Sequence, residues 1–157
     1  MGDAPLPHLR QSGDVHMVEV GDKPETHREA IAEGFVRMSP RLARRFFTGD
    51  LPKGDALASV RLAGIMGAKQ TPALVPLCHP IAISGITVDV GATDIGVRIV
   101  ATVSTVGRTG VEMEAMTAVS VAALALYDMV KGVERGVTVE RIGLVRKSGG
   151  RSGTWER

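Results

Sequence analysis

An almost unbroken apolar segment between Gly110 and Lys131 constrains the fold of this 157-residue chain more than any other feature. Its Ala, Leu and Met content favours a helix over a strand. From Ala115 onward apolar residues occupy nearly every side, which is the pattern of a helix buried within protein. Polar residues interrupt every apolar stretch of membrane-spanning length, so we expect a core helix over residues 111–132 in a soluble protein.

The few polar residues of this helix are informative because they share one side. At about 100° per residue they fall within a stripe roughly 120° wide. They are Glu114, Thr117, Ser120, Asp128 and Lys131. Charges are costly to bury without partners, so we expect the stripe to line a wet polar cavity suited to proton transfer. The alternative is an exposed ion pair between Asp128 and Lys131, with Glu112 and Glu114 complementing the helix dipole.

Composition and charge exclude several classes of protein. Cys78 is the only cysteine, so no intrachain disulfide can form and a reducing, cytoplasmic setting is expected. Residues 1–14 contain Pro5 and Pro7 where a signal peptide needs an uninterrupted apolar segment. The net charge of +2 and an aromatic content of 3% fall short of a dedicated nucleic-acid binder.

Local patterns predict the remaining elements. Thr26 and Glu29 have capping-box spacing, which predicts a helix over about 27–38. A short helix over 41–47 and a loop over 49–54 follow, and Asp55 can then cap a helix that continues to Lys69.

Residues 81–90 and 96–106 show β-branched alternation around a short connection and predict an antiparallel hairpin, and residues 137–146 predict a further strand. This order predicts an α+β sandwich, with helices on one face of an antiparallel sheet. We divide the chain into a flexible segment over 1–13, a single catalytic domain over 14–147 and a glycine-rich basic tail over 148–157.

Two prolines stiffen the segment Pro76–Pro80, which contains Cys78 and His79 and could hold a ligand. Adjacent residues in an extended segment point in opposite directions, so a nucleophilic Cys–His pair is not supported. A buried cysteine in a turn is the alternative. The four histidines show no metal-ligand spacing, and we predict no metal site.

Two basic stretches suggest contacts with an anion. Lys53 precedes a predicted helix, and Lys147 opens a glycine-rich segment, although neither matches a Walker A loop. A solvated loop and a frayed tail are the alternatives. Together with Asp128 and Lys131, these cations favour an anionic substrate handled by acid and base groups.

Four motifs resemble, in order and spacing, the cyclic pyranopterin monophosphate synthase family of molybdenum cofactor biosynthesis. The likeness spans about residues 14–153, and the motifs are Leu77–Pro80, Thr109–Ala115, Tyr127–Lys131 and Lys147–Gly150. The resemblance implies a ferredoxin-like fold assembled as a homohexamer of three dimers, with active sites at subunit interfaces. It also implies conversion of 3′,8-cyclo-7,8-dihydroguanosine 5′-triphosphate to cyclic pyranopterin monophosphate with release of pyrophosphate.

The same resemblance assigns roles to individual residues. Asp128 and Lys131 are similar to an acid–base pair, and Lys53 to a catalytic cation that meets the triphosphate from a neighbouring subunit. The implied substrate-binding residues are Lys23, Arg28, Leu77, Cys78, His79, Glu112, Met113, Glu114 and Lys147. Arg151 stands where the family often has lysine, which changes the donor geometry, so we leave it outside the site.

No step implied by the resemblance is a net redox reaction, so we expect no cofactor to be required, although Mg²⁺ could accompany the triphosphate. We expect no nucleic-acid or membrane partner. The alternatives are a non-catalytic phosphate- or nucleic-acid-binding module and a silent paralogue retained for assembly.

Overall fold

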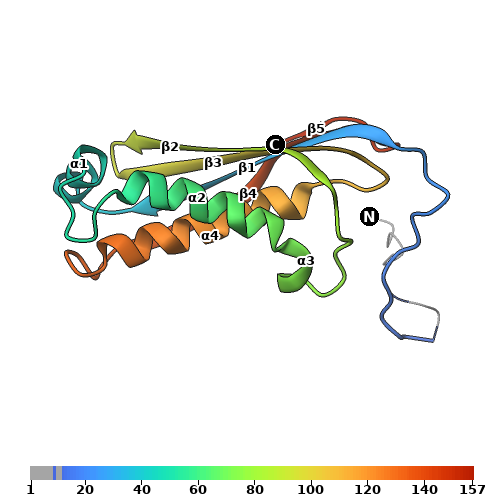
Figure 1. Cartoon of the computed structure of the whole chain (residues 1–157), viewed down its shortest axis with the longest axis horizontal. Coiled ribbons are helices and arrows are strands. Elements are labelled where there is room, and N and C mark those ends of the chain that lie inside the picture. Colours follow the sequence, from blue (N-terminus) through green and yellow to red (C-terminus); the bar gives the residue numbers. More distant parts are fainter. Residues whose placement is uncertain (1–8, 10–11) are drawn as a thin grey trace.

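The computed structural model describes residue 9 and residues 12–157. One layer is a five-stranded sheet and the other is formed by two long helices, α2 and α4, that run side by side beneath it (Figure 1). The strands are β1 (Thr26–Arg37), β2 (Ile83–Thr93), β3 (Gly96–Gly107), β4 (Thr138–Ser148) and β5 (Trp155–Glu156). The helices are α1 (Pro40–Thr48), α2 (Ala56–Lys69), α3 (Thr71–Leu74) and α4 (Glu112–Val130). This architecture confirms the predicted α+β, ferredoxin-like sandwich.

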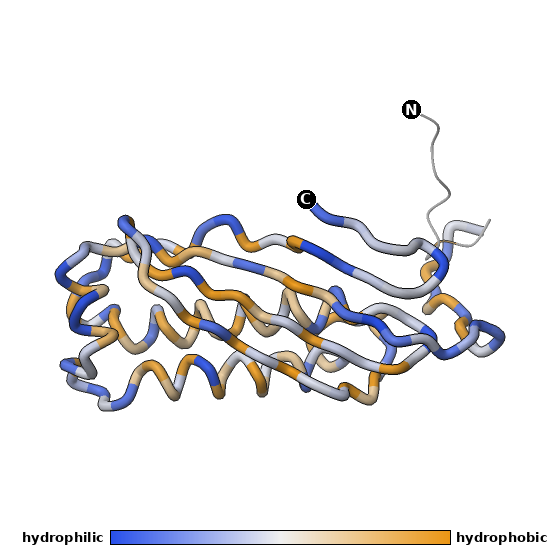
Figure 2. Tube along the Cα trace, turned by 90° about the horizontal axis from the view of Figure 1, so that it is seen from above, coloured by the Kyte–Doolittle hydropathy of each residue, from blue (hydrophilic) through white to orange (hydrophobic). Residues whose placement is uncertain are grey.

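The sheet is antiparallel throughout, in the order β2-β3-β1-β4-β5. α4 packs on β1, β3 and β4, while α2 packs on β2 and on α4, so both long helices cover the same face. Apolar residues recur along these helices and strands, whereas the turns between them are mainly hydrophilic (Figure 2). The predicted hairpin, the strand that follows α4 and the helices α1, α2 and α4 are confirmed.

Side chains at the helix starts explain where α1 and α2 begin. Ser39 Oγ accepts a hydrogen bond from the backbone N–H of Leu42, and Asp55 Oδ1 accepts one from the N–H of Ala58. These bonds satisfy donors that have no partner within the helix. α4 has no such side-chain cap, and its first turn instead contains Glu112 and Glu114.

The helix predicted over 27–38 is wrong, because Thr26–Arg37 forms β1 at the centre of the sheet. The capping-box spacing of Thr26 and Glu29 is present, but buried and partly exposed residues alternate from Ala30 to Val36, with period two. Hydrogen bonding to β3 on one side and β4 on the other therefore outweighs the local helix signal.

The small residues of β1 let α4 approach the sheet closely. A Cβ atom on Gly34 would lie 2.7 Å from Val119 Cγ1 and 3.0 Å from Ile142 Cγ1. Ala30 and Ala32, on the same face, are fully buried beneath the helices. The apolar segment that dominates the sequence thus becomes the central helix of the core.

Two terminal regions complete the description. The predicted flexible segment over 1–13 lies almost wholly outside the described residues. The C-terminal segment returns along β4, where Arg146 pairs with Glu156 and Lys147 with Trp155.

Among the described residues, α4 alone is long and apolar enough to cross a membrane, and half of its most apolar window is buried inside the fold.

Candidate active site

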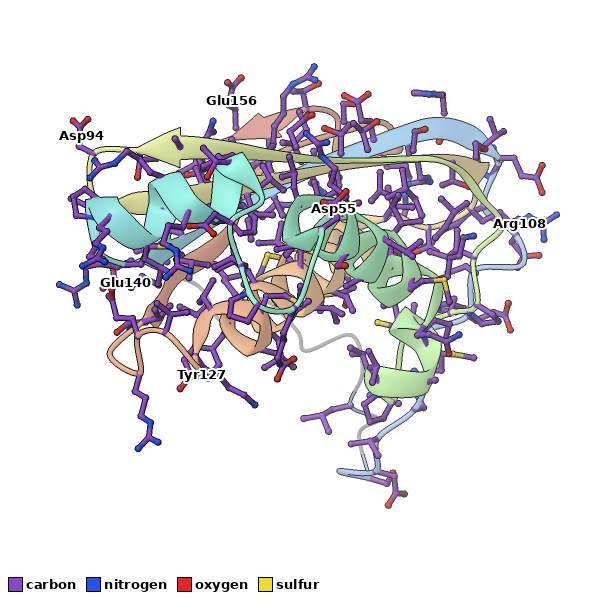
Figure 3. All side chains as sticks on the ribbon, turned by 60° about the vertical axis from the view of Figure 1, so that its left-hand side comes forward. Asp55, Asp94, Arg108, Tyr127, Glu140 and Glu156 are labelled. Carbon is purple, nitrogen blue, oxygen red and sulfur yellow. The ribbon has the colours of Figure 1, made fainter. Side chains whose placement is uncertain are left out.

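The predicted site residues gather in two places, at opposite ends of α4. Lys53 lies just before α2, at the end of the molecule where α4 finishes, whereas the loop after α3 and the start of α4 meet at the other end (Figure 1). Tyr127, next to Asp128, and Arg108, which lines a cavity at the far end, lie well apart in Figure 3. We call the first group the lysine–aspartate cluster (Lys53, Asp128 and Lys131).

In the lysine–aspartate cluster, one carboxylate bridges two ammonium groups. Asp128 Oδ2 lies 2.7 Å from Lys53 Nζ, and Asp128 Oδ1 lies 2.7 Å from Lys131 Nζ. Hydrogen bonds from Lys131 and Lys53 lower the pKa of Asp128 to about 2, and the bond to Asp128 raises the pKa of Lys131. At neutral pH both groups are therefore charged, and the ion pairs stabilise these charged forms.

One prediction about this cluster is wrong, and another remains a prediction. Lys53 was expected to meet the triphosphate of a neighbouring subunit's site, which a single chain does not test; within its own chain it contacts Asp128. The polar stripe was expected to line one wet polar cavity, yet Asp128 and Lys131 form the alternative, an ion pair whose side chains are about half exposed. Ser120 is also exposed and donates to the Met116 carbonyl, so only Glu114 and Thr117 are buried. The helix is too long for its two ends to share a cavity within one chain.

At the other end of α4, a cavity of about 430 Å³ brings together many of the predicted substrate contacts. Its wall combines the N-terminal segment, the loop after α3 and the first turn of α4. The predicted residues in this wall are Lys23, Leu77, Cys78, His79, Glu112, Met113 and Glu114. We call it the acidic cavity, because it contains two carboxyl groups.

Glu114 is the buried acid of this cavity, with 2% of its surface exposed. Loss of hydration raises its pKa to about 6, and the neighbouring Glu112 carboxylate adds to the effect. Its carboxyl group can therefore hold or release a proton near neutral pH. Such a group in a cavity is a candidate for acid–base chemistry.

The adjacent Cys78 and His79 do not form a nucleophilic pair. Burial and the Glu114 charge raise the pKa of the Cys78 thiol, so the thiolate is disfavoured. His79 Nε2 lies 2.8 Å from the Val18 carbonyl, which can only accept, so this nitrogen carries the proton. Nδ1 then remains as the acceptor of the ring.

A second cavity of about 460 Å³ adjoins the first and is strongly basic. Lys23, Thr109, Gly110 and Glu112 line both cavities. Arg28, Arg108, Lys147 and Arg151 supply most of the positive charge of the second, which we call the basic cavity. Thr26 also lines it, and the Thr26 hydroxyl is buried without a hydrogen-bond partner among the described residues. Such an arrangement suits an anion with several oxygen atoms.

Arg28 is held in this wall by backbone carbonyls. Its Nε donates to the Gly107 carbonyl at 2.9 Å, and Nη2 donates to the Arg108 carbonyl at 3.2 Å. Gly149 and Gly150, both with positive φ, bring the chain after β4 so close that Cβ atoms there would collide with the His27 carbonyl oxygen and the Arg28 guanidinium. The glycine-rich segment is therefore part of the cavity wall.

Sequence reasoning missed several lining residues. No local sequence pattern marks Arg108 or Val18 as cavity residues. Strand pairing brings Arg108 to its cavity, and the contact with His79 brings Val18 to its own. Arg151 was set aside, yet it lines the basic cavity together with Ser152. Among the described residues, no group of three or more His, Cys, Asp or Glu could hold a metal ion.

Comparison of the sequence with known proteins finds relatives over almost the whole chain. Residues 17–150 match the model of the MoaC family. A cyclic pyranopterin monophosphate synthase of Corynebacterium efficiens is 53% identical over 150 residues, which cover 96% of this chain and 97% of that protein. A synthase of the same name from Roseiflexus castenholzii is 57% identical over 150 residues, covering 94% and 95%. A third, from Thermomicrobium roseum, is 53% identical over 156 residues, covering 98% and 94%.

The α+β sandwich with its two adjoining cavities, together with relatives that share one enzyme name, defines the class of protein: a biosynthetic lyase for a small molecule. The family match covers most of the chain, and the relatives align with nearly all of it. The chain belongs to the MoaC family.

Proposed function

We propose that this protein is the lyase of molybdenum cofactor biosynthesis that converts 3′,8-cyclo-7,8-dihydroguanosine 5′-triphosphate to cyclic pyranopterin monophosphate and pyrophosphate. Membership of the MoaC family and the name that its relatives share support this activity. The paired acidic and basic cavities fit a substrate with a base-derived ring system at one end and a triphosphate at the other.

The observation that carries the proposal is the separation between the acidic cavity and the lysine–aspartate cluster along α4. Glu114 and Asp128 are 14 positions apart in one continuous helix, which corresponds to about 21 Å along its axis. The acidic cavity includes neither Asp128, Lys131 nor Lys53. We propose that a second copy of the chain brings its lysine–aspartate cluster to this cavity, so that the site is complete only between two subunits.

The basic cavity would hold the triphosphate. Closing a cyclic phosphate forms a P–O bond at the α-phosphorus and breaks the bond to the β-phosphate, so negative charge accumulates on the departing pyrophosphate. Arg28, Lys147 and Lys23 supply cations where that charge develops, which lowers the barrier to its departure.

Proton transfers would fall to three groups with different ionisation. We assign proton exchange near neutral pH to Glu114, whose pKa is raised to about 6. We assign the remaining transfers to Asp128 and Lys131 as base and acid, once the substrate replaces the ion pair that holds both charged in the free chain. Such transfers suffice for a rearrangement without net oxidation. We therefore propose that no resident cofactor is required, that any Mg²⁺ arrives with the triphosphate, and that the protein works in the cytoplasm.

Incubation of the purified protein with the cyclised dihydro-GTP substrate tests this proposal. We expect stoichiometric pyrophosphate and cyclic pyranopterin monophosphate, separated by chromatography and identified by mass. A phosphate- or nucleic-acid-binding module would instead give no product, and its binding to RNA or DNA would weaken steeply with salt.

A further inference from the structure

The segment after β4 turns back and contacts a side chain of the candidate site. The backbone N–H of Gly153 donates to the Gly150 carbonyl at 3.2 Å, which closes a turn whose central residues are Arg151 and Ser152. Beyond the turn, Trp155 pairs with Lys147, and the N–H of Arg157 donates to the Val145 carbonyl at 2.9 Å.

This turn places Ser152 directly on Lys147. Lys147 Nζ donates to Ser152 Oγ at 2.7 Å and lies 3.4 Å from Glu112 Oε1. An ammonium group has three donors, so with one directed to Ser152 two remain for the Glu112 carboxylate and a ligand. Both Ser152 and Lys147 line the basic cavity, and Glu112 lines both cavities.

The backbone of Lys147 is fixed as firmly as its ammonium group. It pairs with Ala30 of β1 on one side and with Trp155 of β5 on the other. Without β5 this end of β4 would be an unpaired sheet edge. A free lysine side chain loses considerable rotamer entropy when it binds a ligand, so holding it in advance favours binding.

We propose that residues 149–157 are a positioning element for Lys147, in which Ser152 holds the ammonium group in the wall of the basic cavity. Ser152 acts through Lys147 and is a positioning residue rather than a catalytic one. The expected effect on substrate binding rests on the proposed function, because a fixed cation at this point would favour binding of the polyphosphate.

Steady-state kinetics with the cyclised substrate test the proposal through three changes. Ser152→Ala should raise KM about five- to tenfold, with a smaller change in kcat, because the lysine must then be ordered during binding. Ser152→Thr retains the hydroxyl group and should restore most of the affinity. Truncation after Gly153, which removes β5, should act in the same direction as Ser152→Ala.

The decisive comparison uses a double variant. If Ser152 acts through Lys147, Ser152→Ala should have almost no further effect in a Lys147→Ala background. An equal loss in both backgrounds, or an unchanged KM in Ser152→Ala, would overturn the proposal.

A readout that does not need turnover separates this inference from the proposed function. The rate at which an acylating reagent modifies Lys147, followed by peptide mass spectrometry, should rise in Ser152→Ala and stay near the wild-type value in Ser152→Thr. An inactive wild-type protein that showed this pattern would contradict the proposed reaction but support the positioning role. Equal Lys147 labelling in all three proteins would overturn the positioning role.

Discussion

Glu114 shows how a single residue combines stability and chemistry. Its carboxyl group is almost fully buried at the start of α4, and the loss of hydration favours the neutral form. The site thereby keeps a group that changes charge near neutral pH, and the folded state is less stable as a result. The Lys53–Asp128–Lys131 cluster shows the opposite arrangement, because two cations stabilise an exposed carboxylate.

Replacing Glu114 with Gln should stabilise the fold in a pH-dependent way. A carboxyl group whose pKa is raised on folding, here from 4.5 to about 6, binds more protons when folded and therefore weakens the fold as the pH rises through this range. We expect Glu114→Gln to increase the free energy of unfolding by about 2 kcal/mol at pH 8, and by under 1 kcal/mol at pH 5. Urea denaturation at the two pH values measures the difference, and a gain independent of pH would contradict it.

Asp128→Asn and Lys131→Ala should each reduce product formation by about 100-fold or more, because each removes a proton-transferring group. The fold should persist, since both side chains are about half exposed. Asp89→Asn provides a matched control, as it alters an exposed carboxylate outside both cavities and the cluster. Near-normal turnover in either cluster variant would refute the acid–base assignment.

At the scale of the elements, short-range signals predicted most of the fold. Three of these signals are local, and each identified its element: Asp55 as a helix cap, the alternation in the β2–β3 hairpin and the apolar composition of α4. β1 was predicted as a helix because its strand character depends on two partners far away in sequence. Ser152 and Arg108 were missed for the same reason. The position of Ser152 depends on the pairing of β4 with β5, and that of Arg108 on the pairing of β3 with β1.

The close contact between β1 and α4 gives a prediction at this scale. Gly34→Ala should lower the free energy of unfolding by about 1–3 kcal/mol, because the new methyl group meets the stiff side chain of Val119. Gly91→Ala is the matched control, since nothing lies within 4 Å of a Cβ atom there. In denaturant titrations, adding Val119→Ala to Gly34→Ala should cost less than the two separate losses combined. Full additivity would argue against the contact.

At the scale of the whole molecule, exposed apolar side chains on the two long helices support the proposed association of subunits. Leu62 and Met66 on α2 and Leu124 on α4 are large apolar side chains with about half or more of their surface exposed. Apolar surface of this kind on long helices is typical of subunit contacts. We expect light scattering to report a hexamer, formed from three dimers. A stable monomer at micromolar concentration would contradict both the assembly and the shared site.

The most direct test of the account is complementation in mixed oligomers. Asp128→Asn disables the lysine–aspartate cluster and His79→Ala alters the acidic cavity. A two-fold pair of the two variants therefore has one site with both parts intact and one site with neither. Co-expressed chains, with mixed oligomers verified by mass, should recover about a quarter of wild-type activity if pairing is random. Asp128→Asn with Lys53→Ala, which alter the same cluster, should recover none. Failure of the first pair in verified mixed oligomers would contradict the proposal that two chains share each site.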